Sequence, residues 1–483
     1  MPLVRTCIAA AIALTLAGCY VVRPSSGGGQ VPPPAARMVQ PADVALPAGY
    51  RIEAVATGLT FPTGVAFDAS GRPYVVESGY SYGEVFTTPR LLRVEADGRT
   101  SVVATGARNG PWTGVVFRDG NFYVAEGGET EGGRILRISP DGHITSLVSG
   151  LPSIGDHHTN GPAIGADGML YFGQGTATNS GVVGNDNAQF GWLKRHPDFH
   201  DIPCRDVALT GRNFEAPHWN GSGTIVSTGA YLPYGTPSTA GQMIPGKVPC
   251  SGAVMRVPLT GGTPELVAWG FRNPFGLAVA PDGQLYVAEN SYDDRGSRPV
   301  WGSADVLWRV KPGAWYGWPD YAEGFPLTRP DFKPPGKAPV QALLQTPPET
   351  PPRPVARFPV HSSADGFDFS RNPVFGNVGE AFVAEFGDQA PTTGKVLGPV
   401  GFKVVRVNVD NGVVEDFAVN RSPNNGPASK LGTGGLERPV AVRFDPEGRA
   451  LYVVDFGVLS QLPDAKPEQG TGVLWRIVRQ GAS

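Results

Sequence analysis

The stretch from Gly276 to Glu289 reads GLAVAPDGQLYVAE, and its pattern decides the fold. An apolar segment, residues 276–279, is followed by the turn signal Asp282-Gly283 and by a second apolar segment that ends in an acidic residue. Two short apolar segments around an Asp-Gly pair are typical of a β-hairpin. The stretch therefore predicts two antiparallel strands with a carboxylate at the end of the second.

The same pattern recurs along the chain. Six copies lie at residues 64–77, 114–126, 161–174, 276–289, 366–385 and 440–455. Most are followed by a third apolar segment, such as residues 134–138, 254–257, 306–310 and 473–477, and several by a fourth, such as residues 144–148. Four-stranded units in series are typical of propeller blades. We predict an all-β fold, a six-bladed β-propeller of four-stranded antiparallel blades. A sandwich is the alternative architecture, but six similar hairpins in series are hard to fit into its two sheets. Five or seven blades are the alternative counts.

The composition agrees with a large all-β domain. The 483 residues include 66 Gly and 48 Pro, which supply turns, and 10% aromatic residues, which favour strands. Only 17% of the residues are charged, and the formal net charge is -3. A nucleic-acid partner would show as a basic stripe, so we expect none.

The N-terminal residues are typical of an export signal. Arg5 precedes an apolar run from Cys7 to Leu16, and Leu16-Ala17-Gly18-Cys19 follows. This tetrapeptide resembles the lipobox of bacterial lipoproteins; the alternative is an ordinary signal peptide. We expect residues 1–18 to be a lipoprotein signal peptide and Cys19 to carry the lipid that anchors the chain to a membrane. The domain would then lie outside the cytoplasm, on the periplasmic side or at the cell surface.

One propeller domain is expected to follow a tether. Residues 19–47 are rich in Pro, Gly and Ser and cannot build a core. Residues 48–483 carry the repeats, with interruptions at about 179–252 and 320–354 and a shorter one at 391–400. Long insertions on a rigid scaffold are usually surface loops and often cover a site.

Two cysteines remain once the signal is set aside. Cys7 leaves with the signal peptide and Cys19 carries lipid, which leaves Cys204 and Cys250 in the first insertion. An even pair in an oxidising compartment favours a disulfide over two free buried thiols. Such a bridge would brace the insertion.

Polar residues are expected to gather at one rim of the propeller. The start of the first strand and the end of the second lie at the same end of a hairpin, and the first strands line the central channel. The rim would therefore bring together His157, His158, Arg272, Asn273, Asn290, Arg438 and the repeated acidic residues. Such a concave polar cluster is the candidate site. The acidic residues also have a structural interpretation, bonding backbone amides, and at most one of two adjacent histidines is expected to face the mouth.

The segment GFRNPFGL at residues 270–277, with Pro281-Asp282-Gly283, Glu289 and the segment YGWP at residues 316–319, resembles the glucose/sorbosone dehydrogenase family. The resemblance covers most of the chain after Pro47. This family includes soluble pyrroloquinoline quinone (PQQ) sugar dehydrogenases on six-bladed propellers. The resemblance implies a PQQ- and calcium-dependent enzyme that oxidises a sugar (aldose) or related alcohol by hydride transfer to the quinone. Its electrons would pass to an external acceptor, because no haem motif is present.

The resemblance also implies roles for single residues. His157 matches the general base of the family, and His158 lies one residue out of register. Arg272 and Asn273 match cofactor-binding residues, and Arg272 would also act catalytically by stabilising charge on the quinone. Arg438 matches an arginine that binds a cofactor carboxylate. The matching calcium ligands are the carbonyls of Asn290 and Ser291.

The chain departs from the family pattern at three places. Thr176 stands where the family often has an aspartate that orients the histidine. No lysine near residues 385–388 matches the lysine that contacts the cofactor, and the calcium loop reads Asn290-Ser291-Tyr292 without the usual Gly-Pro. Two other functions fit the pattern: a non-catalytic envelope propeller that binds a glycan or a protein partner, and a metal-dependent lactonase-type hydrolase that uses the acidic ring.

Overall fold

The computed structural model describes residues 37–81, 85–128, 131–189, 191–388, 396, 398–459 and 466–481. Met38–Ser483 form one compact unit. The predicted signal peptide, its lipidation residue Cys19 and most of the tether lie outside the described residues. No helix in the described part of the chain has the length and apolar content needed to cross a bilayer.

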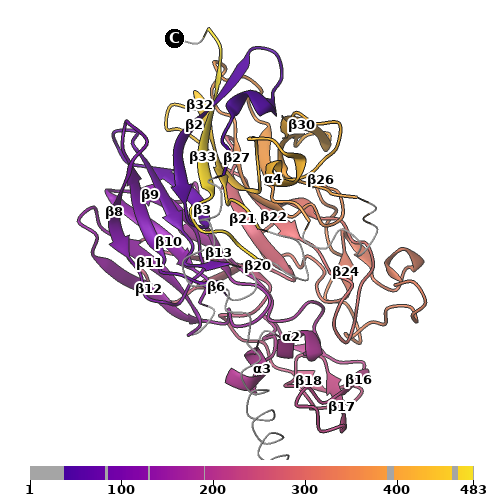
Figure 1. Ribbon diagram of the computed structural model, residues 1–483. Helices are drawn as coiled ribbons and strands as arrows, with labels where there is room; N and C mark the ends of the chain where they lie inside the picture. Colours follow the sequence, from indigo (N-terminus) through magenta and orange to yellow (C-terminus); the bar gives the residue numbers. More distant parts are fainter. Residues whose placement is uncertain are drawn as a thin grey trace, which may run out of the picture. The chain divides into compact units, whose positions relative to one another are not determined.

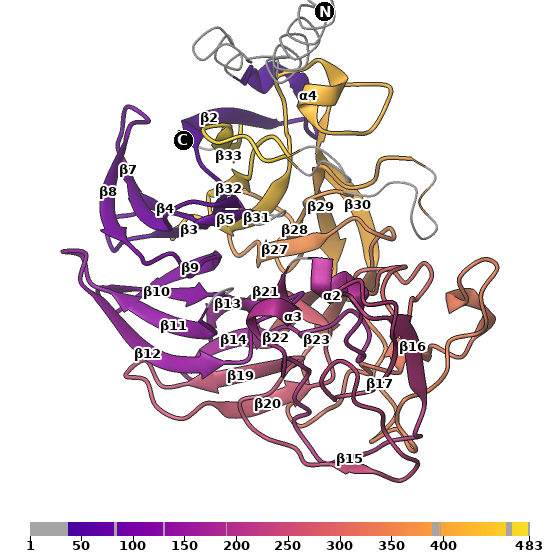
Figure 2. The ribbon, with the colours of Figure 1, turned by 60° about the horizontal axis from the view of Figure 1, so that its bottom comes forward.

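Six antiparallel sheets follow one another in chain order around a central channel, as Figures 1 and 2 show. Blade 1 comprises β3 (Pro62–Phe67), β4 (Pro73–Glu77), β7 (Arg90–Val94) and β8 (Thr100–Thr105). Blade 2 comprises β9 (Trp112–Arg118), β10 (Asn121–Glu126), β11 (Gly133–Ile138) and β12 (Ile144–Leu151). Blade 3 comprises β13 (Thr159–Ile164), β14 (Leu170–Gln174), β19 (Ala253–Val257) and β20 (Glu265–Trp269).

The second half of the ring has the same plan. Blade 4 comprises β21 (Asn273–Val279), β22 (Leu285–Asn290), β23 (Val306–Arg309) and β26 (Ala356–Arg357). Blade 5 comprises β27 (Ala364–Phe369), β28 (Ala381–Glu385), β29 (Lys403–Asn408) and β30 (Val413–Asn420), with β1 (Val44–Ala45) added at its outer edge. Blade 6 comprises β31 (Pro439–Phe444), β32 (Ala450–Asp455), β33 (Gly472–Arg479) and β2 (Tyr50–Leu59). The predicted six-bladed β-propeller is confirmed.

Both ends of the domain close the ring in blade 6. The first long strand, β2, pairs with the last, β33, and the register sets Tyr50 opposite Arg479 and Leu59 opposite Gly472. Three strands of this blade come from the C-terminal part of the chain and the fourth from the N-terminal part. The closure therefore joins segments that are far apart in the sequence.

The glycine that opens most repeats is required by the close approach of the inner strands. A Cβ atom on Gly114 would lie 2.4 Å from the carbonyl oxygen of Gly161, and one on Gly276 would lie 2.2 Å from that of Asp365. Backbone thus packs against backbone around the channel. Only in blade 6 does a larger residue, Ala441, hold this position.

The hydrophobic core lies between the blades. Residues 122–126 of β10 and all residues of β28 and β32 are buried. Each of these strands is covered by a neighbouring blade on both faces, so its sequence is continuously apolar rather than alternating. This explains the uniform Tyr-Val-Ala character of the second segment of each repeat.

The insertion after β14 lies at the lower end of the domain in Figure 1. It contains α2 (Asn185–Gln189), α3 (Trp192–Arg195), β15 (Val207–Ala208), β16 (Asn213–Pro217), β17 (Ile225–Gly229) and β18 (Met243–Ile244). The remaining short elements are η2 (Pro41–Asp43), β5 (Tyr80–Ser81), β6 (Val85–Phe86), β24 (Tyr321–Ala322), β25 (Phe325–Pro326), η3 (Pro330–Phe332) and α4 (Ala428–Leu431). A backbone bridge between Leu209 and Leu344 joins the two long insertions.

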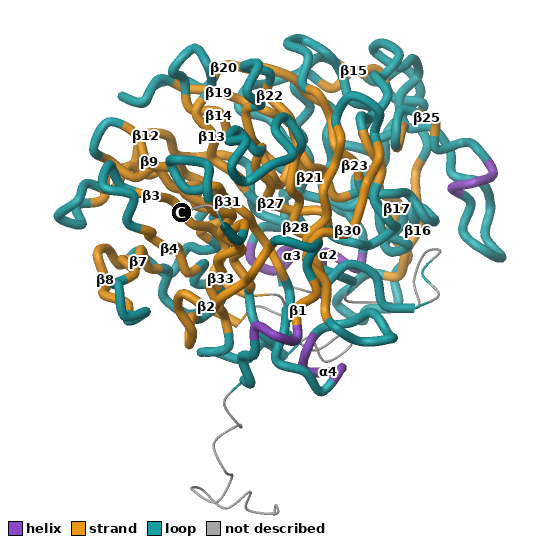
Figure 3. Tube along the Cα trace, turned by 90° about the horizontal axis from the view of Figure 1, so that it is seen from above, coloured by secondary structure: helices purple, strands orange, loops and turns teal. Residues whose placement is uncertain are grey.

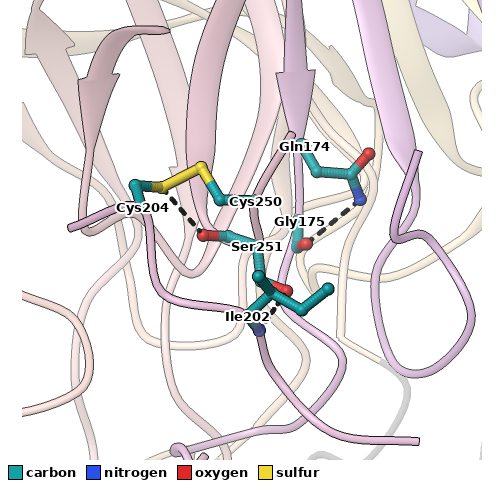
Figure 4. Close-up of a disulfide and its surroundings, with 6 residues drawn as sticks. All are labelled: Gln174, Gly175, Ile202, Cys204, Cys250 and Ser251. Carbon is teal, nitrogen blue, oxygen red and sulfur yellow. Dashed lines mark hydrogen bonds between the residues drawn. A yellow bond between two sulfur atoms is a disulfide. The ribbon is translucent and has the colours of Figure 1, made fainter. Parts of the chain in front are cut away.

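A disulfide between Cys204 and Cys250 braces the base of the first insertion (Figure 4). The two Cα atoms lie 5.1 Å apart, and both side chains are buried. Beside the bridge, the Ser251 amide donates to the Ile202 carbonyl at 2.9 Å. The bridge therefore ties Cys204, inside the insertion, to Cys250, just before β19 of blade 3.

The glycine ring yields a stability prediction. We expect Gly114→Ala to lower the free energy of unfolding by about 1–3 kcal/mol, because the new methyl group overlaps the Gly161 carbonyl. Urea unfolding followed by tryptophan fluorescence measures the change. The control is Ala441→Gly at the equivalent position, expected to cost about 1 kcal/mol or less through chain entropy alone. Equal losses in the two variants would show that the inner strands can move apart.

Candidate functional site

A chain of side-chain amides joins the first strands of three blades at the rim. Asn160 donates to the Asn273 side chain at 2.9 Å, and Asn273 donates to the Asn290 side chain at 2.9 Å. Asn290 in turn donates to the Asp365 carboxylate at 3.2 Å. These hydrogen bonds bring together rim residues that are more than a hundred positions apart in the sequence. They also fix the side chains of Asn273 and Asn290.

His157 is oriented by the backbone of Thr176. Its Nδ1 atom lies 2.9 Å from the Thr176 carbonyl oxygen and 3.1 Å from the Thr176 hydroxyl. A carbonyl can only accept a hydrogen bond, so we assign the proton to Nδ1 and the lone pair to Nε2. No described residue hydrogen-bonds Nε2. The Thr176 carbonyl therefore fixes the orientation of the His157 ring.

The surroundings of His157 keep its imidazole neutral. Burial lowers the pKa of His157 well below its usual value, and the charges of Arg272 and Arg295 lower it further. A neutral ring with a free Nε2 lone pair can accept a proton at pH 7.

The segment that orients His157 is itself held by the first insertion. Asp201 accepts hydrogen bonds from the Ala177 amide at 2.6 Å and from the Thr178 hydroxyl at 2.5 Å. The Thr176 hydroxyl donates to the Thr178 carbonyl at 2.7 Å. Burial raises the pKa of Asp201 to about 7. The insertion thus reaches the site through Asp201, a residue that the sequence analysis did not identify.

Arg272 belongs to a partly buried network of charges. Its guanidinium lies 2.8 Å from Asp293, and Asp293 is also bound by Arg295 at 3.1 Å. Arg295 also forms ion pairs with Asp156 at 2.7 Å and with Asp186 at 2.8 Å. Two guanidinium groups therefore face three carboxylates, next to the histidine.

The network shifts the pKa values of its acids in opposite directions. Burial raises the pKa of Asp156 to about 6, against the attraction of Arg295. Burial alone would also raise the pKa of Asp293, but Arg272 and Arg295 hold it below its usual range. Sequence reasoning missed this network. Its signal was the cluster Asp293-Asp294-Arg295, unusual in a chain with few charges and placed just after the strand of Glu289.

His158 points to a different place. Its ring packs edge-on against Tyr80, with centroids 5.5 Å apart. It lines a small cavity of about 60 Å³ in the channel, together with Asp365 and Phe386. Burial lowers the pKa of His158 to about 4. The two adjacent rings therefore lie in separate environments, and only His157 adjoins the arginine network.

The structure does not bring Arg438 together with His157 and Arg272 in any described contact. Its side chain is fully buried, and its guanidinium donates to the carbonyls of Gly387 at 2.9 Å and Leu459 at 3.1 Å. It also lies over the Phe386 ring at 4.9 Å. These contacts tie together the loops after β28 and β32 and direct its donors to backbone carbonyls.

Of the two predicted calcium ligands, the carbonyls of Asn290 and Ser291, the first is engaged by a protein group. The Asn290 carbonyl accepts a hydrogen bond from Arg272 Nη1 at 3.3 Å, so this oxygen faces a positive charge. Ser291 donates its amide to Asp305 at 2.8 Å and its hydroxyl to Ser303 at 2.7 Å. Within the described ranges no group of three or more His, Cys, Asp or Glu side chains is arranged to hold a metal ion. As the structure stands, the Asn290 carbonyl does not fit a calcium ion.

The repeated acidic residues form hydrogen bonds with backbone amides and indoles of the protein itself. Glu77 accepts the Thr60 amide at 2.7 Å, and Asp455 accepts the Arg438 amide at 2.9 Å. Glu289 accepts the Arg272 amide and the indole of Trp308. The structural interpretation is right for these three positions. It removes the main support for a hydrolase that uses the acidic ring.

Glu385 is the exception among these acids. It is fully buried, and neither carboxylate oxygen receives a hydrogen bond from a described residue. In blades 4 and 6 the third strand supplies a tryptophan indole, but here the equivalent residue of β29 is Val405. Burial raises the pKa of Glu385 to about 8.

This carboxylate predicts a pH-dependent stability. The pKa is raised from 4.5 to about 8 in the folded state, so the folded chain holds a proton that the unfolded chain has lost between these values. The free energy of unfolding should therefore fall as the pH rises from 4.5 to 8, by roughly 1.4 kcal/mol per pH unit at most. Glu385→Gln should remove this part of the slope in urea unfolding series. The control Asp410→Asn, an exposed turn residue of the same blade, should leave it unchanged. A slope that Glu385→Gln does not alter would contradict the burial of an unpaired acid.

Comparisons with known proteins find likeness in structure alone. No protein-family model and no curated protein matches the chain. The holo form of the pyranose dehydrogenase PQQ domain from Coprinopsis cinerea is 17% identical, with a TM-score of 0.55 over 93% of this chain and 99% of that one. The PQQ-bound aldose sugar dehydrogenase from Streptomyces coelicolor is 17% identical, with a TM-score of 0.50 over 90% and 99%. The apo soluble aldose sugar dehydrogenase from Escherichia coli is 14% identical, with a TM-score of 0.52 over 89% and 100%. The chain therefore has, over most of its length, the fold of these sugar dehydrogenases.

Proposed function

We propose that this protein is a PQQ-dependent dehydrogenase that oxidises a sugar or related alcohol. One observation carries the proposal: a neutral histidine, His157, has its Nδ1 atom fixed by a carbonyl and its Nε2 atom open, beside the arginine network of Arg272. The likeness in fold to PQQ-bound sugar dehydrogenases supports it.

The residues of the site suit alcohol oxidation. His157 would take the proton of the substrate hydroxyl on Nε2, while the Thr176 carbonyl stabilises the imidazolium that forms. PQQ, when bound, would accept the hydride from the same carbon, so that a hydroxyl becomes a carbonyl. Arg272 would lie next to the charge that develops on the acceptor.

The arginines set a condition on the cofactor. Arg272 and Arg295 are the cations at the site that would hold the acidic groups of PQQ, and both are paired with Asp293 in the structure. Cofactor carboxylates would therefore share these guanidinium groups with Asp293. Arginine suits this, because its five N–H donors can serve more than one carboxylate.

Calcium belongs to the proposal through the family resemblance, with Asn290 and Ser291 as its proposed ligands. Arg272 Nη1 occupies the Asn290 carbonyl, so a calcium ion could use this oxygen only after the guanidinium turns away. Export is likewise proposed, from the N-terminal pattern that ends at Cys19: a lipid-anchored enzyme outside the cytoplasm that passes electrons to an external acceptor.

Titration of the full chain with PQQ tests the proposal, with and without calcium. We expect saturable binding, seen as a change in quinone absorbance that calcium strengthens, followed by dye reduction on addition of an aldose. Binding without reduction by any aldose would move the substrate to other alcohols. Absence of binding under both conditions would refute the dehydrogenase and favour a propeller that binds a partner without catalysis.

His157→Ala tests the base. We expect turnover to fall by about 10²–10⁴-fold while PQQ affinity changes little, because the proton acceptor is lost and the arginine network stays. The matched controls are His158→Ala, whose ring lies toward the channel, and His143→Ala, an exposed turn residue. Both should keep turnover near that of the unaltered protein. Unchanged turnover in His157→Ala would overturn the assignment.

A further inference from the structure

The central channel has a second opening, at the end opposite the candidate site. The six hairpin turns of the repeats surround it, and Figure 3 views this face of the domain. A cavity of about 230 Å³ opens here. All the residues that line it are described.

One cation in this cavity has no partner within the described structure. Arg443, on the inner strand β31, is half-buried and lines both the cavity and the narrow channel above it. None of its nitrogens takes part in a hydrogen bond, an ion pair or a ring contact with a described residue. At the position that Arg443 holds in β31, the inner strands of blades 1 to 4 carry the apolar residues Ala66, Val116, Ala163 and Ala278.

The other charges of the cavity neutralise each other. Asp368 accepts Arg371 Nη1 at 2.9 Å and the Phe369 amide at 2.8 Å with one oxygen, and the Phe444 amide at 3.0 Å with the other. Arg371 also donates to the Val279 carbonyl at 2.5 Å, which ties it to blade 4. The carboxylate is thus fully used, and the cavity keeps one net positive charge on Arg443.

We propose that this opening binds a small organic acid, with its carboxylate on Arg443 and its apolar body in the cavity. A guanidinium pairs well with a carboxylate, and the pair is stronger in a partly enclosed space than at an open surface. Phe67, Phe117 and Phe444 supply the apolar walls. An engineered cavity of about 150 Å³ accepts benzene, so this larger space has room for an aromatic acid.

Calorimetric titration of the full chain with benzoate, at low ionic strength, tests the site. We expect saturable binding that weakens by about tenfold or more in Arg443→Gln. Arg443→Lys keeps the charge and should retain more of the affinity than Arg443→Gln. The matched control is Arg118→Gln, which removes an exposed charge on β9, the inner strand of blade 2, and should leave binding unchanged.

Two further ligands test each half of the proposal. Benzamide, which has the ring without the charge, and acetate, which has the charge without the ring, should both bind more weakly than benzoate. Benzoate should bind His157→Ala as it binds the unaltered chain, which separates this opening from the catalytic rim. Absence of benzoate binding at millimolar concentration, or equal affinity in Arg443→Gln, overturns the site. Equal affinities for acetate and benzoate would contradict the proposal that an apolar part of the ligand lies in the cavity.

Discussion

The close packing of six inner strands around the channel is the constraint on which the rest of the structure depends. Where Gly114 faces the Gly161 carbonyl and Gly276 faces the Asp365 carbonyl, no side chain intervenes. This contact fixes the radius of the ring and so the separation of its rim segments. His157, at the start of one inner strand, and Arg272, at the start of the next, become neighbours for this reason. The site is a consequence of the ring.

Within that frame, the rim carries two layers of polar contacts with different purposes. The repeated carboxylates bind backbone amides and indoles within their own blades, as Asp455 and Glu289 show. The second layer, from Asp156 through Arg295 to Asp293 and Arg272, connects blades 3 and 4 and their loops. Only the second adjoins an open proton acceptor. Chemistry at the mouth is therefore concentrated at one sector of a ring that is nearly uniform elsewhere.

The sequence predicted the ring well because its information is local. The residues of each repeat indicate where its strands, its turn and its glycine lie. Six blades could therefore be counted from residues such as Gly114 and Glu289. The rim assignments of His157 and Asn273 followed from strand order alone. The partners of Arg272 could not be predicted in this way, because Asp293 and Asn179 lie in loops without a repeat. The inward turn of Arg438 and the unpaired state of Glu385 depend on side-chain packing, for which one sequence holds no pattern.

The closure of blade 6 has a consequence for the order in which the protein can be completed. Strand β2 is synthesised before all six inner strands, yet its partner β33 follows all of them, with Tyr50 opposite Arg479. Until β33 emerges, β2 has an unpaired edge and blade 6 is incomplete. Contacts between such distant segments carry a large loop-closure cost and slow the last step of folding. A nascent chain of this protein would therefore remain an open arc with exposed apolar surface until β33 has been synthesised.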